Sequence, residues 1–208
     1  GKAFVFLRCE LPQCGLFSDG FKSAADALGW NYKPITFQTA DPTTLIAGFK
    51  QALQLHPAAV SVAGIPQEVW QSVLPDYEAA GVPIIPLAIG EATLGKAVVG
   101  SVLTSADYIK LGAVNADWFI NDSNGSGHAL IVNVPTYPVL SAFSRGASAE
   151  IKKNCPACPA HQLDLAISQV AGNQVNSAIV SELQKDPSIK YVITSNGPFV
   201  NGLLAALS

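Results

Sequence analysis

Residues 58–89 of this chain, AAVSVAGIPQEVWQSVLPDYEAAGVPIIPLAI, decide its fold. The apolar runs at the two ends, 58–62 and 83–89, are too short for helices and have the composition of buried strands. The segment between them, 66–81, opens on a proline, has helical periodicity and stops at a glycine. We therefore predict a strand–helix–strand unit whose two strands lie parallel in one sheet.

The same alternation runs through the rest of the chain. Further short apolar runs predict strands at 3–7, 32–37, 97–103, 129–134, 162–167 and 191–194. The second of these contains Pro34, which cannot donate to a ladder and therefore predicts an edge strand. Strands that alternate with helices imply parallel sheets covered on both faces, and such sheets bind small ligands beyond the carboxyl ends of their strands.

Apolar spacing also predicts which helix faces are buried. Four predicted helices have such a stripe: Phe17, Phe21, Ala25 and Leu28 in the first, Leu45, Phe49 and Leu53 in the helix that starts at Asp41-Pro42, Val69, Val73 and Tyr77 in the helix of 66–81, and Tyr108, Leu111, Val114 and Trp118 in the long helix after residue 103. We predict that each stripe faces a core.

The chain divides into two similar halves. The polar stretch 121–127 is the loosest linker, and the same strand–helix pattern restarts beyond it. We predict two lobes, an N-terminal one over 1–103 and a C-terminal one over 104–208, with the boundary where the chain crosses over.

Composition limits the class of protein. Of 208 residues, 49% are hydrophobic and 13% are charged, which is ample material for a core. The net charge of −3, with only 12 Lys and Arg, leaves no electrostatic footprint for nucleic acid or for an anionic membrane. The chain contains no methionine, so we expect residue 1 to be internal to the translated product and any export signal to lie upstream.

The four cysteines form two close pairs, Cys9/Cys14 and Cys155/Cys158. Such pairs suit an oxidising compartment, where each closes a small disulfide loop; free buried thiols are the alternative. A redox role for the second pair needs its first cysteine at a helix N-terminus, but this pair follows a predicted helix end. With His161 the pair offers three zinc ligands without an evident fourth, so we expect no metal and no cofactor.

Three segments, taken in order, resemble the type I periplasmic solute-binding proteins of the ribose-binding kind. They are residues 19–30 (DGFKSAADALGW), 79–85 (AAGVPII) and 186–196 (DPSIKYVITSN). The resemblance implies two doubly wound parallel-sheet lobes that are joined by a hinge and close on a ligand. It also implies an incomplete C-terminus, because family members continue past the position of Ser208. We expect a second polypeptide or a cleaved C-terminal fragment to complete the fold.

The resemblance also implies where a ligand is held, at loops that follow strand carboxyl ends. Carried over residue by residue, the family's contact positions fall on Leu11, Gln13, Cys14, Ala88, Ile89, Tyr137, Phe143 and Asn196. Sugar binders of the family carry an Asp-Arg pair where this chain has Ala88-Ile89, and an Arg where it has Phe143. Since a buried sugar hydroxyl left unpaired costs about 1–3 kcal/mol, these replacements predict a less polar, aromatic or alicyclic ligand.

Each of these positions also has a structural alternative. Phe143 is in register with core residues of its helix, Ala88 and Ile89 fit ordinary packing at a strand end, and the Asn196 side chain is a suitable helix cap. A sugar ligand, the commonest in the family, stays the alternative to an apolar one.

The predicted function is that of an extracytoplasmic solute-binding component of an ABC transporter. Such a protein is periplasmic or extracellular, or tethered by a lipid upstream of residue 1, and it delivers its small molecule to a membrane permease. The alternative is the ligand-sensing domain of a transcriptional regulator or of a signalling receptor. An enzyme is disfavoured, because no phosphate loop, Gly-x-Gly-x-x-Gly or nucleophile elbow occurs and no His lies near a nucleophile.

Overall fold

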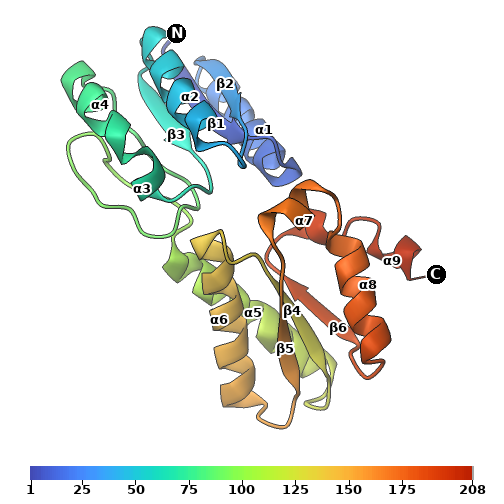
Figure 1. Ribbon diagram of the computed structural model, residues 1–208. Helices are drawn as coiled ribbons and strands as arrows, with labels where there is room; N and C mark the ends of the chain where they lie inside the picture. Colours follow the sequence, from blue (N-terminus) through green and yellow to red (C-terminus); the bar gives the residue numbers. More distant parts are fainter. Residues whose placement is uncertain (208) are drawn as a thin grey trace. The chain divides into compact units, whose positions relative to one another are not determined.

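The computed structural model describes residues 1–207 and divides into two compact units, unit 1 (Gly1–Thr104) and unit 2 (from Ser105 onward). Each unit has a three-stranded parallel sheet with helices packed on it (Figure 1). The sheet of unit 1 has the order β2-β1-β3 and the sheet of unit 2 the order β5-β4-β6. The predicted α/β class with parallel sheets is confirmed.

The elements of unit 1 are β1 (Ala3–Cys9), α1 (Pro12–Ala27), β2 (Asn31–Phe37), α2 (Pro42–Gln54), β3 (Ala59–Val62), α3 (Gln67–Trp70), the 3₁₀ turn η1 (Gln71–Val73) and α4 (Leu74–Ala80). Those of unit 2 are α5 (Ser105–Asp122), β4 (Ala129–Asn133), α6 (Pro138–Asn154), β5 (Ala160–Asp164), α7 (Ile167–Ala171), α8 (Val175–Lys185), β6 (Tyr191–Thr194), the 3₁₀ turn η2 (Gly197–Val200) and α9 (Leu203–Ala206).

Local chemistry sets several helix ends. The Asp41 carboxylate accepts a hydrogen bond from the Thr43 backbone N–H at 3.0 Å and caps α2, with Pro42 in the first turn. Gly29 and Gly81, which follow α1 and α4, have φ angles of 65° and 64°, in the left-handed region that favours glycine.

The two faces of β1 pack on different helices. Phe4 and Phe6 contact Phe21 of α1, with ring centroids 5.1 and 4.8 Å apart. Leu7 points to the opposite face, where it contacts α2. β2 lies at an edge of the described sheet, as Pro34 predicts.

The predicted strands at 83–89 and 97–103 are wrong as regular strands. Isolated parallel bridges join Val60 to Ile84 and Ile84 to Val98, so both segments extend the sheet beyond β3 without forming a continuous ladder. The physical reason is that two of the seven residues of 83–89 are prolines, which have no N–H to donate.

The helix predicted at 66–81 is broken. Pro75 lies in the first turn of α4, where its missing N–H is tolerated, and η1 separates this helix from α3. Val69, predicted to be buried, is 39% exposed, and Trp70 is fully buried in its place. The Trp70 ring stacks on Phe49 with centroids 5.2 Å apart, so an aromatic contact decided which side of α3 faces the core.

The predicted buried stripe of α5 is also wrong in part. Tyr108 is buried, but Val114 and Trp118 are each 63% exposed. The face that packs on α6 carries Gly112, where an added Cβ would overlap the backbone of Phe143. Close helix–helix approach through small residues therefore fixed the orientation of α5, and larger side chains turned outward.

Other boundaries differ by smaller amounts. The strand predicted at 162–167 is β5, which starts and ends earlier, and the last predicted helix is split into η2 and α9. Gly202, with a φ angle of 79°, separates the last two elements. Leu28, predicted to lie on the buried face of α1, is 66% exposed.

Candidate functional site

The carboxyl end of β1 is tied to the start of α1. Cys9 ends the strand, and its predicted disulfide with Cys14 is confirmed, with a Cα–Cα distance of 5.5 Å. Because α1 begins at Pro12, Gln13 and Cys14 lie in its first turn rather than in the loop, and Leu11 is the N-cap residue. The Cys14 sulfur is buried and bonded, whereas the Gln13 side chain is partly exposed.

An acidic residue that the sequence analysis did not select organises the neighbouring loops. The Glu10 carboxylate accepts hydrogen bonds from the Thr39 backbone N–H at 3.0 Å and from the Thr39 hydroxyl at 2.8 Å. This contact joins the loop after β1 to the loop after β2. A polar side chain in the short loop after the predicted strand 3–7 is the feature of the sequence that could have indicated Glu10.

Ala88 and Ile89 lie where segment 83–89 ends, and both are buried, with exposed fractions of 4% and 1%. Ala88 has a φ angle of 56° and donates its N–H to the Val102 carbonyl at 3.0 Å. A non-glycine residue in this region costs about 1–2 kcal/mol and persists only where surrounding contacts hold it. Their burial fits the packing alternative, and contact with a ligand stays a prediction.

The loop that follows is held by one side chain. Gln67 of α3 accepts a hydrogen bond from the Thr93 N–H at 2.8 Å and donates to the Thr93 carbonyl at 3.2 Å. Gln67 is 8% exposed, so this pair of bonds is largely shielded from water. It positions residues 90–96 at the carboxyl edge of unit 1.

A polar network occupies the carboxyl ends of β4 and β5 in unit 2. Asn133, which is 3% exposed, donates to the Asp164 carboxylate at 2.7 Å, and Ser141 of α6 donates to the Asn133 carbonyl oxygen at 3.4 Å. Gln162 donates to the same Asp164 oxygen at 2.7 Å. The sequence analysis missed these residues because only the strand pairing brings them together.

Tyr137 and Phe143 lie at and beyond the start of α6. Tyr137 is the N-cap residue, and its side chain makes no capping hydrogen bond. Phe143 is fully buried, as its core alternative predicts, and its contact with a ligand is not tested by this placement.

The carboxyl end of β6 carries two polar side chains without internal partners. Asn196 is 8% exposed, and its carboxamide has no hydrogen-bond partner among the described residues. It does not cap η2 through its side chain, so that structural alternative is wrong. The neighbouring Ser195 hydroxyl is buried and also lacks a partner within residues 1–207. Since a buried polar group without a partner costs about 1–3 kcal/mol, the Ser195 hydroxyl favours a polar ligand group at this place, and the adjacent Asn196 carboxamide offers further donors and an acceptor to it.

The structure thus brings the predicted residues to the carboxyl edges within each unit. Leu11, Gln13, Cys14, Ala88 and Ile89 belong to the edge of unit 1, and Tyr137, Phe143 and Asn196 to that of unit 2. Among these predicted residues, the side chains able to form hydrogen bonds are Gln13 at the first edge and Tyr137 and Asn196 at the second.

Residues 1–207 contain no cluster of three or more His, Cys, Asp or Glu side chains that fits a metal ion. The predicted disulfide between Cys155 and Cys158 is confirmed, with a Cα–Cα distance of 5.3 Å, so the zinc reading of these cysteines with His161 is wrong. Within the same residues, no helix combines the length and apolar character needed to span a bilayer.

Comparison with protein families matches residues 14–208 to the family described as periplasmic binding protein domain. Comparison with curated proteins finds no match. Among solved structures, a periplasmic sugar-binding protein of an ABC sugar transporter from Legionella pneumophila has a TM-score of 0.78 at 15% identity, with 99% of this chain and 74% of that chain covered.

Two further solved structures have similar scores. A 5-methylthioribose transporter solute-binding protein from Thermotoga lettingae has a TM-score of 0.78 at 14% identity, over 99% of this chain and 63% of that one. A structure from Bacteroides fragilis, whose protein is described as a LacI transcriptional regulator, has a TM-score of 0.72 at 13% identity. The alignment covers 99% of this chain and 73% of that one. At these identities the likeness establishes the fold alone.

Proposed function

Because this chain belongs to the family of periplasmic binding protein domains, we propose that it is the solute-binding component of an ABC transporter. The family and the similar structures are binding proteins rather than enzymes. The chain has the α/β fold of type I periplasmic binding proteins over the part that it covers. The proposal includes an extracytoplasmic location, a small-molecule ligand and a membrane permease as partner. A protein tethered to the membrane by a lipid is one form of this location.

The observation that supports a binding role best is the polar pair at the end of β6. The side chains of Ser195 and Asn196 have no internal hydrogen-bond partners among the described residues, and they follow a strand carboxyl end, where sheets of this type receive ligands. A solute can form hydrogen bonds with these two side chains only when it is bound at this edge of the sheet. Binding would then favour a closed arrangement of the two units, which the permease recognises.

We propose that the solute combines an apolar body with a few hydrogen-bonding groups. Ala88 and Ile89 offer no charge to a sugar hydroxyl, whereas Gln13 and Asn196 supply carboxamides. The similar Thermotoga lettingae structure holds 5-methylthioribose, whose methylthio group is apolar. That precedent supports a solute that is less polar than a plain pentose.

The test is isothermal titration calorimetry of the intact protein against aromatic acids, alicyclic acids, pentoses and hexoses. We expect an aromatic or alicyclic compound to bind, and Asn196→Ala to weaken it about tenfold, equivalent to about 1.4 kcal/mol. Asn201→Ala is the matched control, because Asn201 is exposed and its hydrogen bonds are made by its backbone N–H and carbonyl. Tight binding of plain pentoses or hexoses with no response to aromatic acids would contradict the apolar proposal.

We further propose that additional polypeptide, either a second chain or a cleaved C-terminal fragment, completes the fold. The similar Legionella pneumophila chain is longer, since the alignment covers 74% of it. In unit 2, Val114 and Trp118 of α5 are exposed, and an apolar helix face of this kind normally packs on something. Native mass spectrometry of the protein as isolated would detect the companion; a lone, monodisperse chain of this mass would argue against it.

A ligand-sensing domain of a transcriptional regulator is the second candidate, and the Bacteroides fragilis structure favours it. The two functions differ in what binding does. A regulator's solute changes the DNA affinity of a linked domain, whereas a transport component's solute changes its affinity for a permease.

A further inference from the structure

We propose that His128 and His161 form a binding site for a divalent transition-metal ion of the Zn²⁺ kind. His128 directly precedes β4, and His161 lies near the start of the neighbouring strand β5. The site therefore lies at the amino ends of the strands of unit 2, opposite the carboxyl edge that carries Asn196. It is independent of the proposed solute site.

The first observation is the distance between the two imidazoles. His128 Nε2 and His161 Nδ1 face each other 3.3 Å apart. Two nitrogens that each bind one tetrahedral zinc ion at about 2.0–2.1 Å are separated by about 3.3–3.4 Å. The two rings therefore have the spacing that a shared ion requires.

The second observation is a hydrogen-bond chain that fixes the tautomer of His128. The Ser188 hydroxyl donates its one proton to the Asp186 carboxylate at 2.6 Å. The same oxygen, 2.8 Å from His128 Nδ1, therefore accepts, and Nδ1 carries the ring proton. The lone pair of neutral His128 is consequently on Nε2, which faces His161.

Asp186 strengthens this arrangement. Its Oδ2 atom lies 3.6 Å from His128 Nδ1, and its Oδ1 atom accepts hydrogen bonds from the Ser188 backbone N–H at 2.9 Å and from the Ser188 hydroxyl at 2.6 Å. Metal-binding histidines characteristically donate their other ring N–H to a carboxylate or another acceptor, which orients the ring. Ser188 and Asp186 supply that support here.

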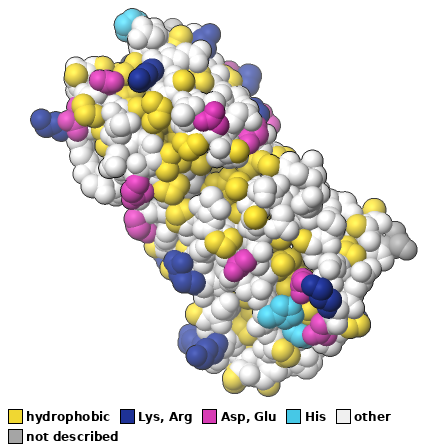
Figure 2. Space-filling view, viewed as in Figure 1, with side chains coloured by type: hydrophobic (Ala, Val, Ile, Leu, Met, Phe, Trp, Pro, Cys, Tyr) yellow, Lys and Arg dark blue, Asp and Glu magenta, His cyan; other side chains and the backbone are white. Residues whose placement is uncertain are grey.

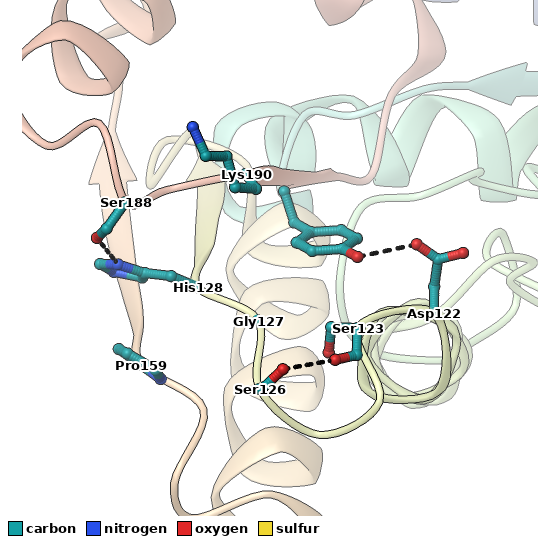
Figure 3. A pocket seen from close by; sticks show the side chains of 9 residues that line it. Asp122, Ser123, Ser126, Gly127, His128, Pro159, Ser188 and Lys190 are labelled. Atoms are coloured by element: carbon teal, nitrogen blue, oxygen red, sulfur yellow. Dashed lines mark hydrogen bonds between the residues drawn. The ribbon is translucent and has the colours of Figure 1, made fainter.

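The third observation is access. His161 is exposed to solvent, and His128 borders an open cavity of about 480 Å³ that Pro159, Ser188 and Lys190 also line (Figure 3). Histidine side chains gather on the surface of unit 2 beside acidic and basic groups (Figure 2). Because no third protein ligand exists among residues 1–207, water from this open side completes the coordination.

Imidazole ligands select the ion class. They suit Zn²⁺, Cu²⁺ and Ni²⁺, whereas Mg²⁺ and Ca²⁺ prefer oxygen. In the absence of metal, His161 Nδ1–H donates to His128 Nε2. Metal binding moves that proton to His161 Nε2 through solvent, so the ring stays neutral and no net proton is released. The ion then links the largely exposed edge strand β5 to the buried strand β4.

Calorimetric titration with ZnCl₂, on the intact protein without an affinity tag and after chelator treatment, tests the proposal. We expect binding of one ion by this site, a loss of at least tenfold in affinity in His161→Ala, and no response to MgCl₂. Two controls separate a specific site from adventitious binding. His56→Ala removes an exposed histidine of unit 1 and should change nothing, while Lys190→Ala removes a positive charge from the cavity and should tighten binding.

Affinity that is unchanged in His161→Ala, or no binding of Zn²⁺ at millimolar concentration, would overturn the proposal. A second measurement does not depend on how well a variant folds. Nitrogen NMR of the unmodified protein should find the ring proton of His128 on Nδ1 and a large Zn²⁺-dependent shift of His128 Nε2. A proton on Nε2, or signals that ignore Zn²⁺, would equally reject it.

Discussion

At the scale of single residues, buried polar groups have a direct effect on the stability of this protein. Tyr77 of α4 is fully buried, and its hydroxyl donates to the Phe49 carbonyl at 2.9 Å. Burial raises the pKa of Tyr77, because a phenolate could not be solvated there. The same ring packs edge-on against Phe49, so one residue combines apolar burial with a satisfied hydrogen bond.

Tyr77→Phe should lower the free energy of unfolding by about 1 kcal/mol, because the buried hydrogen bond from its hydroxyl to the Phe49 carbonyl is lost. Urea denaturation at neutral pH measures this. Tyr191→Phe is the control, since its hydroxyl bonds Asp122 at the surface, at 2.9 Å, and its removal should cost less. Equal losses for the two variants would contradict the argument from burial.

The raised pKa of Tyr77 also predicts a pH dependence. The unfolded chain ionises this tyrosine near the ordinary value of 10.0, whereas the folded chain resists ionisation. The stabilisation is therefore fully present below pH 10 and is lost as the pH rises towards the folded value. The denaturation midpoint of the unmodified protein should fall as the pH rises above 10, and the midpoint of the Tyr77→Phe variant should fall less steeply. Parallel pH profiles for the two proteins would show that Tyr77 does not contribute.

Pairs of elements are held by contacts that depend on a few small or bonded residues. Gly112 of α5 and Gly146 of α6 lie where added Cβ atoms would overlap backbone atoms of the facing helix. The Cys9–Cys14 disulfide joins β1 to α1 in a comparable local way. The packing of helices and strands in this protein is therefore sensitive to substitution at a few positions and tolerates substitution elsewhere.

Gly112→Ala should destabilise the protein by about 1–3 kcal/mol or more, because the helices must separate or bend. Gly20→Ala is the matched control: Gly20 lies within α1, and a Cβ there meets nothing within 4 Å. That control should be stabilising by about 0.5–1 kcal/mol, since alanine favours helix. Thermal and urea unfolding compare the two, and a neutral Gly112→Ala would refute the close-packing account.

Replacing Cys9 and Cys14 together by serine should cost about 2 kcal/mol, the loop-entropy estimate for a short closed loop. The same double change at Cys155 and Cys158 provides a second, similar loop for comparison. Unfolding in the presence and absence of a reductant measures both. Stability that does not respond to a reductant in the unmodified protein would contradict a structural role for either bond.

At the scale of the whole molecule, ligand binding and stability are linked. A solute that binds only the folded protein stabilises it by about 2.7 kcal/mol at one hundred times its dissociation constant. We therefore expect the solute found by calorimetry to raise the melting temperature of the intact protein, by an amount that grows with the logarithm of its concentration above the dissociation constant. Asn196→Ala should reduce this shift, whereas Asn201→Ala should not. A shift of the same size in both variants would place the solute elsewhere.

The sequence alone determined the alternation of strands and helices, the parallel character of both sheets, the edge position of β2 and the closeness of the cysteines within each pair. Each of these depends on residues close together in the chain: an apolar run, Pro34, Gly29 or a pair of nearby cysteines. Features that depend on neighbouring residues can adopt few conformations, and the sequence therefore predicts them well.

Tertiary structure alone decided which helix faces are buried and which polar groups meet. The outward position of Trp118 follows from the close approach of α5 and α6 at Gly112, and the contacts of Asn133 with Asp164 and of His128 with His161 follow from strand register. These features depend on packing between residues that are distant in the chain. Hydrophobic spacing cannot anticipate them, because a close backbone contact can outweigh the burial of a larger side chain.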